Sequence, residues 1–163
     1  MSTKPNGSET PRGEADSDRR RLMLACARAT DGELEAAVAG FGDADAARDV
    51  RAPETGLVMM RGRIGGTGAP FNFGEMSVTR AVVQLSDQSI GFGYQMGRSH
   101  VRARLAAVVD ALGQDPVRRA QLEDVFVQPV LARAAADDAN VQAESAATRV
   151  NFFTMTRGED ADT

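Results

Sequence analysis

The residues best suited to chemistry form a glycine-rich corner flanked by arginines. Arginine binds carboxylates and phosphates with two parallel hydrogen bonds, and glycine lets the backbone come close to a ligand. Lys4 is the only lysine in the chain, so an anion site here must be built from arginine. The predicted substrate or anion site consists of Arg63, Gly65, Gly66, Gly68 and Arg98.

The run from Gly62 to Gly68 (GRIGGTG) also has to be tested as a nucleotide-binding loop. It lacks the Gly-Lys-Ser/Thr ending of a phosphate loop and the G-x-G-x-x-G spacing of a dinucleotide fold. The segment after it has a strand pattern, so it offers no helix N-terminus to a phosphate. A self-contained nucleotide loop is therefore not predicted.

The chain has one cysteine and one histidine, which restricts the catalytic and metal sites it could form. Cys26 is the only cysteine and His100 the only histidine, so an internal disulfide and a His/Cys zinc site within one chain are excluded. A Ser-His-Asp triad would have to use His100. The sequence predicts no catalytic residue, no metal ligand and no cofactor bound by this chain.

Composition narrows the class of protein. The formal net charge is −4, which argues against a nucleic-acid-binding protein with a basic patch. No run approaches the roughly 18 apolar residues of a membrane span, and the first residues have no apolar segment typical of a secretory signal. We expect a cytoplasmic protein that binds neither nucleic acid nor membranes.

The hydrophobic pattern predicts one α+β domain. An antiparallel sheet of about four strands is expected, with helices packed on it and a small N-terminal helical hairpin before it. Ser17 is the expected N-cap of the first helix. The predicted order is a disordered tail over 1–16, one domain over 17–158 (helices in 17–50, a strand meander in 54–98, helices in 99–147, a last strand in 149–157) and a polar tail over 159–163.

The third strand of the meander has an unusual pattern. Bulky residues alternate with small ones, so one face carries anchors, with Tyr94 expected in the core, and the other has almost no side chains. Glycine within a strand indicates a bulge or a very close neighbour. Three explanations stay open: the glycine face packs against the protein's own helix, a partner chain fills it, or a ligand lies on it. The alternating residues are Ile90, Phe92, Tyr94 and Met96 against Gly91, Gly93, Gln95 and Gly97.

Several motifs together resemble the PhnG subunit family of the carbon–phosphorus lyase core complex. The similarity runs in register from about residue 20 to residue 160. The motifs are Glu54-Thr55-Gly56-Leu57-Val58, Arg63-Ile64-Gly65-Gly66-Thr67-Gly68, Gly74-Glu75, Thr79-Arg80-Ala81, Gly97-Arg98, Asp110-Ala111-Leu112 and Phe152-Phe153-Thr154-Met155-Thr156-Arg157-Gly158.

The resemblance implies a role in bacterial phosphonate use. With its PhnH, PhnI, PhnJ and PhnL partner proteins, a PhnG subunit takes part in displacing adenine from ATP by an alkylphosphonate, which yields α-D-ribose 1-methylphosphonate 5-triphosphate. In this family nucleosidase activity belongs to PhnI and carbon–phosphorus cleavage to the iron–sulfur protein PhnJ. The resemblance therefore implies an assembly subunit, with ATP a substrate of the complex, and it places no catalytic residue on this chain.

Two other functions remain compatible with the sequence. One is a small stand-alone enzyme that binds an anion or a nucleotide through Arg63, Arg98 and His100. The other is a homodimeric binding module whose self-interface is the glycine face of the third strand. Both require the isolated chain to act without partner proteins.

Overall fold

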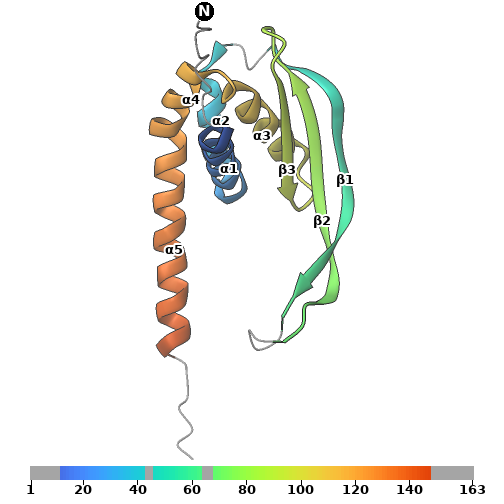
Figure 1. Ribbon diagram of the computed structural model, residues 1–163, viewed down its shortest axis with the longest axis vertical. Helices are drawn as coiled ribbons and strands as arrows, with labels where there is room; N and C mark the ends of the chain where they lie inside the picture. The colour runs from blue at the N-terminus through green and yellow to red at the C-terminus, as the bar shows by residue number, and fades with distance from the viewer. Residues whose placement is uncertain (1–11, 43–45, 64–67, 148–163) are drawn as a thin grey trace, which may run out of the picture.

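The fold is a three-stranded antiparallel sheet that packs one face against helices (Figure 1). The computed structural model describes residues 12–42, 46–63 and 68–147. The sheet order is β1-β2-β3, so neighbours in the chain are neighbours in space. In order, the elements are α1 (Arg12–Arg28), α2 (Asp31–Ala39), β1 (Arg48–Gly62), β2 (Phe71–Gln84), β3 (Ile90–Met96), α3 (His100–Leu112), α4 (Pro116–Leu122), the π-helical turn η2 (Glu123–Val127) and α5 (Gln128–Ala147).

Helices α2, α3 and α4 each begin at a capping residue. Thr30 and Glu33 form a capping box at the start of α2, in which each side chain bonds the other residue's backbone N–H. Ser99 caps α3, and its hydroxyl accepts the Arg102 N–H. Asp115 caps α4, with Pro116 in the first turn.

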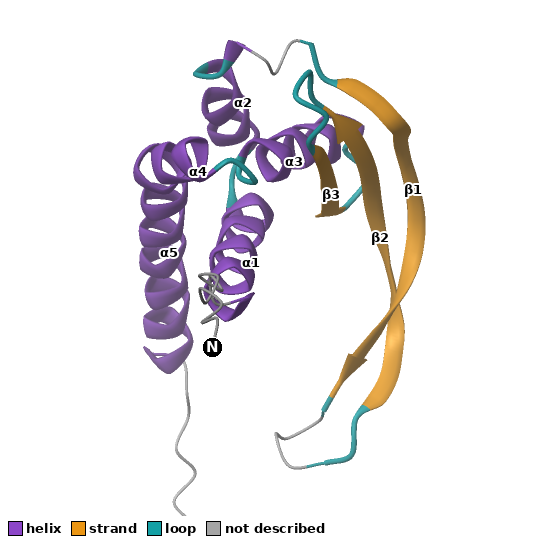
Figure 2. Ribbon diagram, turned by 45° about the horizontal axis from the view of Figure 1, so that its top comes forward, coloured by secondary structure: helices purple, strands orange, loops and turns teal. Residues whose placement is uncertain are grey.

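The first two strands form a ribbon that extends beyond the third. Pairing of β2 with β3 runs only from Gln84↔Ile90 to Val78↔Met96. Pairing of β1 with β2 continues to Gly62↔Phe71. We call residues 57–62 and 71–77 the arm. Figures 1 and 2 show the arm and α5 extending from the body in the same direction.

The hydrophobic core lies between one face of the sheet and the helices, with α3 across the centre (Figure 2). Ala81 and Val83 of β2 point into it, and Phe126 of η2 is the largest fully buried side chain. Helix α1 lies beside β3, where the Gln95 side chain donates to the Cys26 carbonyl. The face of the sheet towards α3 is called the inner face below.

The glycines of β3 lie on the inner face and are in contact with α3. A Cβ atom on Gly91 would lie 1.9 Å from the Ala107 carbonyl oxygen, and one on Gly93 would lie 1.8 Å from the Ala103 carbonyl oxygen. Neither position has room for a side chain, because helix backbone occupies the space. Close packing on the protein's own helix is therefore the explanation that holds, and a partner chain or ligand on the glycine face is excluded.

The bulky residues of β3 point the other way, which corrects a prediction. Tyr94 was expected in the core, but it is 55% exposed. The alternation of the strand was correct, but the sequence pattern suggested the wrong inward face. Large side chains usually mark the buried face, whereas here the helix comes so close that only glycine fits beneath it.

The boundaries differ from expectation in two places. Helix α1 begins at Arg12, within the segment expected to be disordered, so Ser17 lies inside the helix and is not its N-cap. Strand β1 begins at Arg48, within the segment expected to be helical. It contains Pro53 at an irregular step of its register, which an edge strand tolerates.

The sheet has three strands in the described part of the chain, against about four expected. The last expected strand, 149–157, lies outside the described residues, as do residues 1–11 and the tail 159–163.

Candidate functional site: the open face of the sheet

The face of the sheet opposite α3 carries apolar side chains along its length. Side chains alternate between faces, and Thr55, which contacts His100 of α3, fixes which residues of β1 point inward. Glu54, Val58 and Met60 therefore point outward, as do their partners across the sheet. We call the following side chains the outer apolar face: Val58 and Met60 of β1, Met76 and Val78 of β2, and Ile90, Phe92, Tyr94 and Met96 of β3.

The four side chains on β3 are exposed, whereas Val58, Met60 and Met76 are half-buried. Phe92 is 50% exposed and Met96 is 68% exposed. Val78 is only 6% exposed, although it lies outside the hydrophobic core cluster, because its neighbours on the outer face shield it. A contiguous apolar patch on a soluble domain marks an interaction surface.

Two phenylalanines continue this face to the end of the arm. The ring of Phe73 lies over Gly62, where an added Cβ would be 2.9 Å from the ring carbon Cε1. Gly62 shares the outward orientation of Met60 by strand alternation. The rings of Phe71 and Phe73 are 6.2 Å apart at their centroids, and the side chains are 42% and 58% exposed.

A charged row crosses the outer face beside Tyr94. The Arg80 Nε atom lies 2.6 Å from Glu54 Oε1, and Arg51 Nη1 lies 3.6 Å from the same oxygen. Together with Gly56, Val58 and Val78, these side chains line a shallow hollow at Tyr94. One carboxylate between two guanidinium groups leaves this row positively charged.

A buried carboxylate, Asp110, paired with the half-exposed Arg19, holds β3 against α1 and α3. Both oxygens of Asp110 accept from Arg19, at 2.8 Å each, and one also accepts the Phe92 N–H at 2.9 Å. Asp110 is 2% exposed, and its carboxylate raises the pKa of Arg19 through the hydrogen bond. The Arg19 guanidinium also lies 5.9 Å from the centre of the Phe92 ring. No role for Asp110 was predicted from the sequence; its position among the apolar residues of α3 is the signal that could have identified it.

A second cluster of charges joins α2 to α5. Arg133 donates to both oxygens of Glu33, at 2.8 and 3.0 Å. This hydrogen bonding, together with bonds from Thr30, lowers the pKa of Glu33 to about 2. On the neighbouring helix, burial raises the pKa of the Cys26 thiol to about 12, so this thiol is unreactive at neutral pH.

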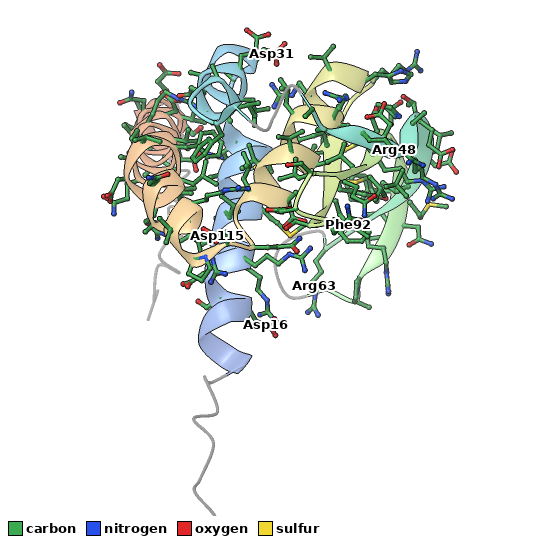
Figure 3. The ribbon with its side chains drawn as sticks, turned by 90° about the horizontal axis from the view of Figure 1, so that it is seen from above. Asp16, Asp31, Arg48, Arg63, Phe92 and Asp115 are labelled. Atoms are coloured by element: carbon green, nitrogen blue, oxygen red, sulfur yellow. The ribbon has the colours of Figure 1, made fainter. Side chains whose placement is uncertain are left out.

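Of the five residues predicted to bind an anion, Arg63 and Arg98 lie far apart. Arg98 follows β3 and its Nε atom lies 3.4 Å from the Ser77 hydroxyl. Ser77 pairs with Leu57, and Arg63 lies six residues further along the strand direction, which is about 20 Å. Figure 3 shows Arg63 at a distance from Arg48, at the opposite end of β1. Gly65 and Gly66 lie outside the described residues, and Gly68 is exposed. Anion binding by these residues stays a prediction.

His100 takes part in one contact that resembles a catalytic pair. Its Nε2 atom lies 3.3 Å from the Thr55 hydroxyl, which also bonds Thr79 at 2.9 Å. A hydroxyl becomes a nucleophile when a base beside it is held in place by a third group, often a carboxylate. Within the described residues, no carboxylate is hydrogen-bonded to the His100 imidazole. The Thr79 hydroxyl in turn donates to the Gly97 carbonyl, which ties the end of β3 to β2. The cluster joins two strands to the start of α3, a structural role.

Neither a metal centre nor a membrane span is found in the described residues. No three acidic, histidine or cysteine side chains there are grouped so that they could hold a metal ion. Within the same residues, no helix has the length and apolar character needed to cross a bilayer.

Comparison with known proteins gives a consistent result. The model of the family described as "Phosphonate metabolism protein PhnG" matches residues 17–158. A relative from Rhizobium meliloti (strain 1021), named alpha-D-ribose 1-methylphosphonate 5-triphosphate synthase subunit PhnG, is 52% identical over 142 residues. The aligned region covers 87% of this chain and 90% of the relative.

Proposed function

The chain belongs to the PhnG family of phosphonate metabolism proteins, and on this basis we propose that it is a subunit of α-D-ribose 1-methylphosphonate 5-triphosphate synthase. The complex transfers an alkylphosphonate to C1 of the ribose of ATP and releases adenine. In phosphonate catabolism this chain contributes by assembly with other subunits, and the bond-breaking residues belong to them.

The observation that carries this proposal is the outer apolar face. Half-exposed aromatic and methionine side chains on an ordered sheet are typical of a surface that another protein covers. Methionine side chains suit such a surface because they adapt to irregular neighbours. The described residues offer no comparable arrangement of nucleophile, base and orienting carboxylate.

We propose PhnH, PhnI, PhnJ and PhnL as the partner proteins, and the cytoplasm as the compartment. ATP and the alkylphosphonate are substrates of the assembled complex, and this chain holds no cofactor of its own. The arginines at positions 63 and 98 are proposed to contribute to an anion site only when partner subunits bring other groups beside them.

Co-expression tests the proposal directly. The tagged chain is expressed with the four partner proteins and purified, and the complex is supplied with ATP and methylphosphonate. We expect the partners to co-purify and adenine to be released by the complex but not by the isolated chain. Failure of wild-type chain to retain any partner, or adenine release by the chain alone, would contradict the proposal.

A stand-alone anion-binding enzyme is the other candidate, and the geometry does not favour it. Its arginines lie at two separate places, and its histidine bonds a threonine that holds two strands together. A calorimetric titration of the isolated chain with ATP separates the two functions. Only a stand-alone enzyme would bind and turn over the nucleotide without partner subunits.

A further inference from the structure

We propose that the outer apolar face is the docking surface for another subunit of the synthase, which presents an apolar segment with acidic residues at its margin. This inference rests on the proposed function. It adds which of the chain's surfaces is covered and the chemistry of the surface that covers it.

The outer apolar face is long, and its far end lies on the arm. This face runs from Phe92 on β3 along the arm to Phe73, whose ring lies over Gly62 just beyond the register shift between Met60 and Arg61. A two-stranded ribbon is marginally stable by itself, and the arm has no third strand or helix among the described residues. A partner that lies along this face therefore covers the exposed rings and also gives the arm the additional layer that a ribbon needs.

Charged side chains, mostly arginines, border the outer apolar face on both sides. Arg51 and Arg80 stand on one side of the aromatic side chains, with Glu54 between them. On the other side, Arg19, Arg20 and Asp16 of α1 border a hollow that also contains Met23 and Phe92. Figure 3 shows Asp16 and Phe92 on the same side of the molecule, and Asp31 on the other. The carboxylate that pairs with Arg19 is buried beneath it, so the margin presents more guanidinium groups than carboxylates.

The arginines at the margin bear on which protein segment could cover the outer apolar face. In a two-fold dimer through this face, the same arginine-rich margins would lie against each other, and like charges across an interface weaken it. The chain's own residues 148–163 carry both signs of charge, with Arg149 and Arg157 beside their apolar residues and Glu159, Asp160 and Asp162 after them, so the test below includes deletion of this segment. A partner with carboxylates at its margin fits both the apolar centre and the arginines.

The test uses the inertness of the native thiol. Cys26 is buried and its pKa is raised to about 12, so a single introduced cysteine is labelled selectively by maleimide. Met96→Cys places a thiol on the outer apolar face, and Val117→Cys places one on α4, at a side chain with 67% exposure against 68% for Met96. Both full-length variants are labelled alone and after co-purification with PhnH, PhnI, PhnJ and PhnL.

We expect labelling of the Met96→Cys chain to slow at least tenfold in the complex, while labelling of the Val117→Cys chain is unchanged. Equal labelling rates of the Met96→Cys chain alone and in the complex would overturn the docking surface but leave the proposed function intact, since the partners would still have co-purified. Slow labelling of the isolated Met96→Cys chain would also overturn the docking surface. If size-exclusion chromatography then showed a dimer, the occupant would be a second copy of the chain. If deletion of residues 148–163 restored fast labelling, the occupant would be the chain's own C-terminal segment.

A second measurement does not depend on labelling. Tyr94→Ser with Met96→Ser removes two exposed side chains from the outer face, and Val117→Ser with Val125→Ser removes two of similar exposure from the helical side. We expect the first pair to weaken partner retention at least tenfold and the second pair to leave it unchanged. Circular dichroism melts confirm that both variants fold. Equal partner retention by the two folded variants would count against the docking surface.

Discussion

The two faces of β3 differ in how closely the next layer approaches. On the inner face the carbonyl groups of α3 come so near that Gly91 and Gly93 have no room for a methyl group. On the outer face the side chains of Phe92, Tyr94 and Met96 are half exposed or more. The inner face of β3, which has almost no side chains, packs on α3 and so forms part of the fold. The outer face of β3, which carries the large side chains, stays exposed in the isolated chain.

The comparison also separates two uses of charge. On the helical side, Asp110 and Glu33 are each held by an arginine from a distant part of the chain. These pairs join α1 to α3 and α2 to α5. On the open side, Glu54 is shared by two arginines and the excess positive charge faces outward. Charge on the covered side is matched within the chain, whereas the charged row on the open side has more arginines than carboxylates.

The largest effect is expected from a methyl group on the covered face. Gly93→Ala would place Cβ against the Ala103 carbonyl, and because that atom belongs to the helix backbone, α3 must move away from the sheet. We expect a loss of about 3 kcal/mol in the free energy of unfolding, measured by urea denaturation. Gly56→Ala, on the outer face with no atom within 4 Å of the added Cβ, is the control and should change stability by less than about 1 kcal/mol. Equal effects of the two substitutions would remove the distinction between the faces.

The next largest effect concerns the buried carboxylate. Asp110→Ala removes the partner of Arg19 and leaves the Phe92 N–H without its acceptor. We expect a loss of about 2 kcal/mol, since Arg19 is half exposed and recovers hydration, and a smaller loss for Asp110→Asn, which keeps an acceptor. Glu123→Gln, which breaks the more exposed pair with Arg21, should cost less than about 1 kcal/mol in the same urea experiment. A cost for Asp110→Ala as small as that of the control would show that this ion pair does not hold β3.

A smaller effect on folding is expected from the open face. Met96→Ser exposes no new apolar surface, because the side chain is already 68% exposed in the isolated chain. The unfolding free energy should therefore change by less than about 1 kcal/mol, as for other surface substitutions. Val83→Ser, on the same sheet but fully buried, should cost several times more. Urea titrations of both variants measure the contrast, and a large loss with Met96→Ser would mean that the outer face contributes to the fold.

The smallest effect is a pH dependence on the helical side. The pKa of Glu33 is lowered in the folded chain, so its pair with Arg133 stabilises fully above the ordinary carboxyl pKa, and this stability is lost as the pH falls towards about 2. We expect melting temperatures between about pH 5 and about pH 3 to fall more steeply for the wild type than for Glu33→Gln. Parallel profiles would show that this carboxylate is not held in the folded state.

Local features of the fold could be predicted because they depend on neighbours in the chain. Ser99 and Asp115 cap helices by bonding N–H groups two or three residues away, and the period-two pattern of β3 follows from strand geometry. The absence of a catalytic set in the sequence and the family motifs also pointed to a subunit. The expected anion site stays a prediction, because Arg63 and Arg98 lie in different parts of the sheet and Gly65 and Gly66 lie outside the described residues.

The sequence by itself determined that β3 has one bulky face and one bare face, and which family the chain belongs to. Only the tertiary structure decided which face is buried, because the answer depends on how close α3 lies. The alanine residues of α3 and the glycines of β3 allow backbone to meet backbone, and this contact leaves the aromatic and methionine side chains no place except the open face. The role of Asp110 was decided in the same way, since Arg19 and Phe92 reach it only after α1 and β3 have packed on α3.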